Sequence, residues 1–501
     1  MKNKRSLHIF SSVLLLTMII QSLSVLRTSA LAREFGAGYE MDAMNLANIV
    51  MVCIVNIGGA TIPVTIIPYL AKIRKGREKN EKALNTFVFT VICISGGFLV
   101  LSYTMIAILL YHLQAGTENR FVYLTALLIL IMGFGQFARM LSWIQTAYLE
   151  TAGKFIVIKL AALTASLVSY VYILVKPHIS IYETAVVIGG SIFIEFFVLF
   201  IANRRTAQYR FKFQFDFKDK EYRELLKRAI PCMFSSALYQ VTILIPNFAA
   251  GFFGEGYIST MTYANQIYSI FQTLIVLNLL SMMFPILSRS FVSSYEKGRE
   301  QFYFFSSTAN MLVYPVAVGL IILSPNLVHL LFEHGDFTAE SGKRVVHFVI
   351  FLAASLPFIT LKELIFKSFY SIGDTLTPMI NSTITMCIQI VFLLAGIYWL
   401  GLQTLIISPL FVAIFSVILG YIKLNQKIYL QTIVKKIVKT QLLSLLNASM
   451  MGGVIYFVLE LLNMTPLLST IICFVIGVVF YAFLVILTQR KFIQTLLVKE
   501  H

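Results

Sequence analysis

The chain has 501 residues, of which 58% are hydrophobic and only 13% are charged, and its formal net charge is +17. So few charged residues could not cover the surface of a soluble protein of this length, which excludes a soluble globular fold. The Lys and Arg residues lie in short segments between long apolar runs, as in the cytoplasmic loops of membrane proteins. The positive charge is therefore explained by the cytoplasmic location of these loops and by contact with anionic lipids. It does not predict nucleic-acid binding.

Long apolar runs follow one another along the whole sequence, and each can cross about 30 Å of hydrocarbon as a helix of about 20 residues. The first run, 7–26, is longer than the apolar core of a signal peptide, about 7–15 residues, so we interpret it as a membrane helix. The pattern predicts an all-α polytopic membrane protein with about fourteen transmembrane helices. Their expected limits are 7–32, 42–71, 85–112, 121–148, 155–175, 182–203, 229–252, 258–288, 302–331, 344–370, 376–400, 404–422, 440–461 and 466–488.

An internal repeat organises these helices. Each copy has a glycine turn, then a helix with an Ala-Asn pair, and then a proline twenty residues after that asparagine. The two copies consist of Phe35–Tyr39, Asn48 and Pro68, and of Phe253–Tyr257, Asn265 and Pro285.

The repeat predicts a six-helix lobe over 1–203, a cytoplasmic linker over 204–228 and a second six-helix lobe over 229–424. An extra helix pair follows over 425–501. Six is an even number, so the two lobes share one orientation and are related by a pseudo-twofold axis along the membrane normal. Basic loops alternate with loops that have few Lys and Arg residues or are acidic. The predicted helix count puts all the basic loops on one side of the membrane. Both termini are therefore expected in the cytoplasm.

The sequence carries no enzyme motif. It has no phosphate-binding Gly-Lys-Ser/Thr loop, no paired-His helix and no aspartate cluster of the kind that polyprenyl transferases use with magnesium. The five cysteines are scattered through apolar runs, which predicts neither a disulfide framework nor a metal site. We therefore predict that the chain is not an enzyme and has no catalytic residue, metal site or cofactor.

Charged side chains inside the apolar runs are the first candidates for function, because an ionised group in lipid needs a cavity or a partner. Arg27 either lines a cavity and contacts an anionic head group, or extends to the outer interface. Asp42 begins the second predicted helix, where a carboxylate either caps the helix N-terminus or binds substrate. Arg139 and Lys159 either reach the cytoplasmic surface or face a cavity, and Glu195 could pair with either.

A second group of candidates lies in the tenth predicted helix and in the repeat. Glu363 and Lys367 stand four residues apart and are expected to bridge each other, either lining the cavity or anchoring the interface. Asn48 and Asn265 are matched by the repeat and are expected to meet across the pseudo-axis, with Gln266 nearby. Such amides serve as interhelical contacts or as substrate contacts.

Three motifs stand out in the sequence: the stretch from Arg27 to Ala43, the stretch from Leu331 to Thr338, and the stretch from Phe369 to Pro378. Together they resemble the MurJ (MviN) branch of the MOP flippase superfamily. The resemblance implies a lipid II flippase of the bacterial cytoplasmic membrane that works by alternating access between two lobes. A cationic cavity would hold the pyrophosphate head group, and the polyprenyl tail would lie along the last two helices. Membrane potential, Na⁺ or H⁺ would drive a monomeric transporter.

Several positions depart from the family pattern. Gln21 stands where the resemblance implies an arginine, as does Gln266, and Thr28 stands where it implies an aspartate. Another expected arginine falls near Val55 and Asn56. The cavity then either uses other cations, such as Lys362, Lys367 or Arg139, or carries another polyprenyl-linked glycan, as an exopolysaccharide or teichoic-precursor flippase does. A cation-coupled drug exporter of the related MATE group is a further alternative. A membrane glycosyltransferase would need the acidic metal cluster that the sequence lacks.

Overall fold

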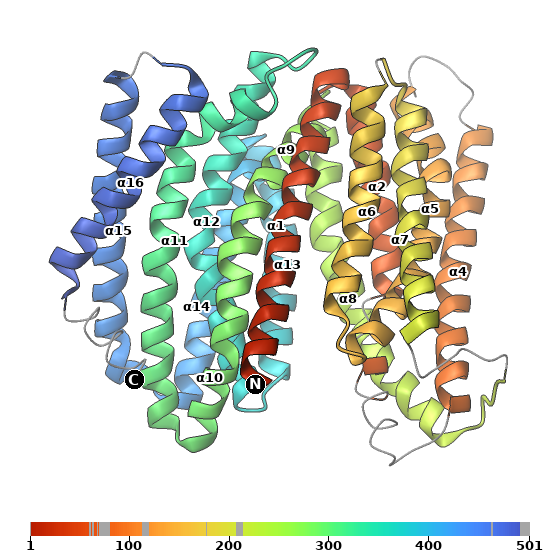
Figure 1. Cartoon of the computed structure of the whole chain (residues 1–501), viewed down its shortest axis with the longest axis horizontal. Coiled ribbons are helices and arrows are strands. Elements are labelled where there is room, and N and C mark those ends of the chain that lie inside the picture. Colours follow the sequence, from red (N-terminus) through yellow and green to blue (C-terminus); the bar gives the residue numbers. More distant parts are fainter. Residues whose placement is uncertain are drawn as a thin grey trace. The chain divides into compact units, whose positions relative to one another are not determined.

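The computed structural model describes residues 2–59, 62, 65–67, 69, 81–112, 120–176, 178–206, 214–461 and 464–490. The regular secondary structure of these residues is helical. Contacts divide the chain into two compact units, Met1–Ser259 and Thr260–His501, which we call unit 1 and unit 2. Unit 1 contains α1 (Lys2–Phe35), α2 (Tyr39–Gly59), α4 (Glu81–His112), α5 (Arg120–Thr151), α6 (Phe155–Val175), α7 (Ile181–Thr206) and α8 (Lys220–Gly251) (Figure 1).

Helix α9 (Tyr257–Phe271) begins in unit 1 and continues into unit 2. The other helices of unit 2 are the π-helical η2 (Gln272–Leu277), α10 (Asn278–Ser293), α11 (Tyr295–Leu331), α12 (Ala339–Ser371), α13 (Leu376–Leu400), α14 (Gln403–Ile428), α15 (Gln431–Leu461) and α16 (Pro466–Thr488).

Among the described residues, thirteen helices are long and apolar enough to cross a membrane. The predicted all-α multi-pass fold is therefore confirmed. The predicted helix 258–288 is divided into α9 with 15 residues, η2 with 6 and α10 with 16, and none of these alone reaches 18 residues. The predicted count of about fourteen membrane helices therefore stays a prediction.

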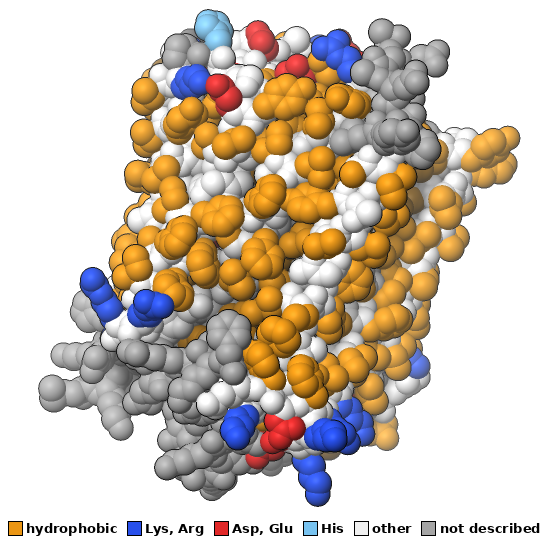
Figure 2. All heavy atoms as spheres, turned by 90° about the vertical axis from the view of Figure 1, so that its right-hand side faces the viewer, with side chains coloured by type: hydrophobic (Ala, Val, Ile, Leu, Met, Phe, Trp, Pro, Cys, Tyr) orange, Lys and Arg blue, Asp and Glu red, His pale blue; other side chains and the backbone are white. Residues whose placement is uncertain are grey.

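The surface has the pattern of a protein embedded in lipid. Figure 2 shows one face on which a broad band of hydrophobic side chains lies between charged side chains at its upper and lower margins. On α4, for example, Val100 and Met105 are each 64% exposed. Such a band matches the hydrocarbon layer, and the charged margins match the two interfaces.

Unit 1 includes a helix that we placed in the second lobe. Helix α8 packs against α2 and α4, because Tyr222 and Leu225 join a buried apolar cluster with Phe87 of α4. The helix begins at Lys220, capped by the Asp219 carboxylate, which accepts from the backbone of Glu221 and Tyr222. Part of the predicted linker 204–228 is therefore the first turns of α8. The predicted lobe boundaries themselves stay predictions.

Two glycines allow α5 and α7 to approach closely. A Cβ atom on Gly135 of α5 would lie 2.5 Å from the carbonyl oxygen of Gly189 on α7, which is a backbone atom and cannot rotate away. We expect Gly135→Ala to destabilise unit 1 by about 1–3 kcal/mol, the usual effect of overpacking. Thermal unfolding of the purified protein measures this effect.

Gly189→Ala is the matched control for this prediction. A Cβ atom on Gly189 would have its nearest neighbour at 3.7 Å, an ordinary van der Waals distance. An equal loss of thermal stability in both variants would contradict the argument from close approach.

In unit 2, the last two helices, α15 and α16, lie beside α11 (Figure 1). Polar contacts join them to it. Asn310 of α11 donates to Gln441 of α15 at 2.8 Å, and Asn326 donates to Ser469 of α16 at 3.2 Å. Tyr481 of α16 donates to the carbonyl of Met311 at 2.7 Å. In an apolar surrounding such interhelical hydrogen bonds orient helices that dispersion alone would leave free to rotate. The pair α15–α16 therefore belongs to the packing of unit 2.

Candidate functional site

The two glycine turns of the repeat lie against each other at the end of unit 1. In the turn before α9, Gly256 has a φ of +86°, a conformation that side chains with a Cβ rarely adopt. A Cβ atom on Gly256 would lie 2.3 Å from the carbonyl oxygen of Ala37 in the first turn. Only glycine fits at position 256, because the backbone has a positive φ and because the Ala37 carbonyl oxygen leaves no room for a Cβ atom.

Asp42 ties these two turns together. The residue is 2% exposed, and its carboxylate accepts hydrogen bonds from the backbone N–H of Gly256 at 2.6 Å and of Ser259 at 2.7 Å. It also accepts from the Ser259 hydroxyl at 2.5 Å, and Asn45 donates to the same hydroxyl at 3.3 Å. We call Asp42, Gly256 and Ser259 the Asp42 cap.

The Asp42 cap corrects the simplest capping interpretation. Asp42 lies in the first turn of α2, yet it satisfies amides at the start of α9. A carboxylate is favoured at a helix N-terminus, because the amides there have no partner within the helix and carry partial positive charge. Spacing along α2 could not reveal that the capped helix begins more than 200 residues later in the sequence.

Arg27 points into unit 1. Its Nη1 donates to the hydroxyl of Ser169 on α6 at 3.3 Å, and Ser169 is fully buried. Arg139 of α5 lies near enough to interact with it electrostatically. Contact with a buried serine is inconsistent with extension to the outer interface. A role of Arg27 in substrate binding stays a prediction.

The predicted amide contacts are divided between the units. Asn48 lies in unit 1 and is half-buried, whereas Asn265 and Gln266 lie in unit 2. The Asn265 side chain is exposed and donates to the carbonyl of Met261 in its own helix at 2.9 Å. The expected meeting of Asn48 with Asn265 stays a prediction.

The predicted pair of Glu363 and Lys367 is replaced by other contacts. Glu363 lies 3.2 Å from Lys362, its neighbour in α12. The Lys367 ammonium lies 5.0 Å from the ring centre of Phe284 on α10, in cation–π geometry. Both long side chains are half-buried, and the adjacent helix offers Lys367 a partner that spacing within α12 cannot show.

A third cluster lies in the motif between α12 and α13. The Asp374 carboxylate accepts from the N–H of Thr377 at 3.0 Å, from its hydroxyl at 2.6 Å, and from Lys427 at the end of α14. Burial raises the pKa of Asp374, but the hydrogen bonds from Lys427 and Thr377 outweigh it and lower the pKa to about 2. The cluster fixes the start of α13 to the end of α14.

Asp374→Asn tests this contribution. The pKa of Asp374 is lower in the folded chain than the value of about 3.9 in an unfolded chain, so the ionised carboxylate stabilises the fold above about pH 4. That stability is lost as the pH falls toward about 2. We expect the variant to lose about 1–2 kcal/mol at pH 7, a modest value because Lys427 is 44% exposed.

Melting temperatures of the purified protein between pH 7 and about pH 3 measure the effect, and the gap between wild type and variant should narrow toward the acid end. Asp336→Asn, in an exposed loop of the same unit, is the control and should change neither value. A gap that stays constant with pH would contradict the assignment to the Asp374 charge.

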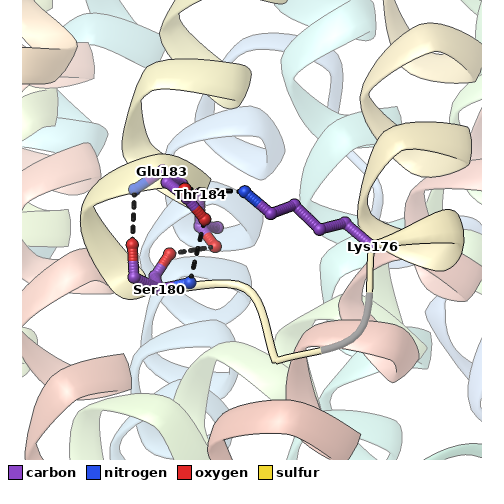
Figure 3. A network of polar contacts seen from close by, with 4 residues as sticks. All are labelled: Lys176, Ser180, Glu183 and Thr184. Atoms are coloured by element: carbon purple, nitrogen blue, oxygen red, sulfur yellow. Dashed lines mark hydrogen bonds and ion pairs between the residues drawn. The ribbon is translucent and has the colours of Figure 1, made fainter.

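A polar network between α6 and α7 has a local structural role (Figure 3). Ser180 and Glu183 form a capping box, in which the N–H of Glu183 donates to the Ser180 hydroxyl and the N–H of Ser180 donates to the Glu183 carboxylate, each at 3.3 Å. Lys176 donates to Glu183 at 2.7 Å, and this bond raises the pKa of Lys176. The network sets the start of α7.

Among the described residues, no group of three or more His, Cys, Asp or Glu is placed to hold a metal.

The comparison with protein families decides the identity of the chain. The family model of the lipid II flippase MurJ matches residues 31–478. The chain belongs to the MurJ family. Two relatives, each named a probable lipid II flippase MurJ, show how low the sequence identity to this chain is. The one from Rhizobium meliloti is 27% identical over 194 residues, which are 37% of this chain and 35% of the relative. The one from Aquifex aeolicus is 25% identical over 281 residues, 54% of this chain and 52% of the relative.

The aligned parts thus span about a third to a half of these MurJ relatives. Among solved structures, the lipid II flippase MurJ in an inward closed conformation matches with a TM-score of 0.77 and 22% identity, over 96% of this chain and 99% of that one. An inward-facing multidrug resistance MATE transporter of the MOP superfamily matches with a TM-score of 0.65 and 15% identity, over 83% and 96%. At these identities the structural matches establish the fold alone, and that fold is the one shared by MurJ and MATE proteins.

Proposed function

We propose that the chain is a flippase that moves an undecaprenyl-pyrophosphate-linked glycan precursor, peptidoglycan lipid II, across the bacterial cytoplasmic membrane. The observation that carries the proposal is the match of the MurJ family model over residues 31–478. The fold is consistent with it, because the MurJ structure matches over more of the chain and with a higher TM-score than the MATE transporter. Both termini are assigned to the cytoplasm, since the basic loops share their side.

The proposed mechanism is alternating access by a monomer, driven by an ion gradient or the membrane potential and without nucleotide hydrolysis. The Asp42 cap supplies a contact suited to such a cycle. The cap consists of hydrogen bonds to a carboxylate, and water molecules can replace these bonds when the two turns separate. Separating a packed apolar contact would instead expose hydrophobic surface to water, which is unfavourable. Arg27 is assigned to the pyrophosphate, because a guanidinium binds phosphate oxygens in pairs.

Complementation of a bacterium depleted of its own MurJ tests the proposal. Expression of this chain should restore growth and return lipid II to the outer leaflet, as measured by accessibility of the lipid II head group to an external reagent. A well-expressed chain that leaves lipid II in the inner leaflet would contradict the cargo assignment.

The second candidate is a flippase for another polyprenyl-linked glycan, such as an exopolysaccharide or teichoic precursor. Gln21, Asn56 and Gln266 favour it, because each is an uncharged residue near a position where the family resemblance implies a cavity arginine. Strains that lack each of these flippases distinguish the cargoes, since only the strain with the matching cargo should be rescued. A MATE-type exporter would instead change dye efflux without rescuing any of them.

A further inference from the structure

A glutamine inside unit 1 has none of the partners that a buried amide requires. Gln136 of α5 is fully buried, and neither its Nε2 nor its Oε1 has a hydrogen-bond partner among the described residues. Buried amides in folded proteins are almost always paired with protein groups, water or a ligand. In a membrane-spanning helix the need is stronger, since lipid offers no partner. Gln136 therefore indicates a missing partner within reach.

A half-buried arginine lies beside it in the helix. Arg139 follows three residues later on α5, so both side chains lie on neighbouring positions of one helix face. Its Nε is buried and has no hydrogen-bond partner in the described part of the chain. Gln136 Nε2 and Arg139 Nε are both N–H donors, so two unpaired donors from one helix face lie in the interior of unit 1.

The surrounding charges leave an excess of positive charge. Arg139 lies close enough to Glu195 of α7 and to Arg27 of α1 for electrostatic interaction. Within the part of the chain that the structure describes, no ion pair within 4.0 Å joins Arg139 or Glu195 to another residue. Lys159 also interacts with Glu195 and with a second carboxylate, Glu150. Three cationic and two anionic groups carry a net charge of +1.

The backbone explains why these groups are close. Gly135 and Gly189 allow α5 and α7 to touch, and Arg139 lies four residues after Gly135 on the same face of α5. Arg27 is held near by its hydrogen bond to Ser169 of α6. The close glycine contact thus brings Arg139 of α5 and Glu195 of α7 toward each other, and Arg27 joins them from α1. The unpaired atoms of this region are two donors, Gln136 Nε2 and Arg139 Nε, and one acceptor, Gln136 Oε1.

We propose that unit 1 binds a small monovalent inorganic anion, such as chloride, between α1, α5 and α7, with Gln136 Nε2 and Arg139 Nε as donors. An anion accepts from both unpaired donors and neutralises the excess positive charge, whereas a water molecule would do only the first. A cation is excluded by the two guanidinium groups. A lipid phosphate is excluded from these two donors because both atoms, Gln136 Nε2 and Arg139 Nε, are buried. The proposal does not depend on the transported cargo.

The test compares chloride with gluconate, a larger anion, for the purified full-length chain in lipid nanodiscs at constant ionic strength. A ligand that binds the folded state raises the melting temperature in a saturable way. We expect chloride to raise the melting temperature of the wild type by several degrees and to leave that of Gln136→Met unchanged. Gln240→Met is the matched control, since Gln240 of α8 is also a buried amide with an unpaired oxygen and should keep the full chloride effect.

Equal melting temperatures of the wild type in chloride and gluconate would overturn the proposal, as would an undiminished chloride effect in Gln136→Met. If Gln136→Met does not fold, crystals of the wild type grown in bromide decide the question. An anomalous bromide peak within hydrogen-bond distance of Gln136 Nε2 supports the site. The absence of a peak at that position overturns it.

Discussion

Asp42→Asn is expected to reduce translocation of the cargo at least tenfold while the protein is still inserted in the membrane. The carboxylate accepts three hydrogen bonds, two from backbone N–H groups and one from the Ser259 hydroxyl. Asparagine keeps one acceptor and turns an NH₂ donor toward the other donors. Each charge-assisted hydrogen bond contributes about 1.5–3 kcal/mol, and about 1.4 kcal/mol is a tenfold change in population. The start of α9 should therefore open far more often.

Two measurements check this prediction. Complementation of MurJ-depleted cells reports translocation, and amide hydrogen exchange over residues 256–260 reports opening at the start of α9. Exchange there should be at least about tenfold faster in Asp42→Asn.

Glu40→Gln is the matched control. Glu40 is another carboxylate of the same helical turn, and among the described residues it accepts one hydrogen bond, from the Tyr39 hydroxyl at 3.1 Å. Normal complementation and unchanged exchange in Asp42→Asn would remove the Asp42 cap from the mechanism.

The positions of the helices could be predicted from the sequence because polar residues limit long apolar runs. The helices 155–175, 376–400 and 466–488 were expected at the limits that the structure gives to α6, α13 and α16. The start of α8 was missed, since its first turns are charged on one face and expose that face. Tyr222 and Leu225 are buried there by tertiary contacts, which hydropathy does not detect.

The site was predicted less completely, because its contacts join distant parts of the chain. Asp42 was identified from its place at a helix start, but its partner helix depends on how the two glycine turns meet. The four-residue spacing of Glu363 and Lys367 allowed a pair, yet Lys367 contacts Phe284 of another helix. The sequence gives no reason to select Gln136 as a binding residue, because a single glutamine in an apolar run usually makes an interhelical contact.

Gly256→Ala is expected to have the largest effect of any single methyl group added to unit 1. A left-handed backbone costs an ordinary residue about 1–2 kcal/mol, and Gly256 has a φ of +86°. The new Cβ atom would also lie 2.3 Å from the Ala37 carbonyl oxygen, so the two turns must separate. Together these effects should cost at least about 3 kcal/mol and abolish complementation. They should also break the bond from the Gly256 N–H to Asp42.

Two other glycines of the turns separate the causes. Gly254→Ala introduces a strained φ of +117° with no neighbour nearer than 3.9 Å, so it should cost only the backbone term. In Gly38→Ala the nearest atom would lie at 3.6 Å, and that variant should behave as wild type. Melting temperatures and complementation of all three variants should therefore fall in the order Gly38→Ala, Gly254→Ala, Gly256→Ala. If Gly256→Ala is no worse than Gly254→Ala, then contact between the turns is not what requires glycine at this position.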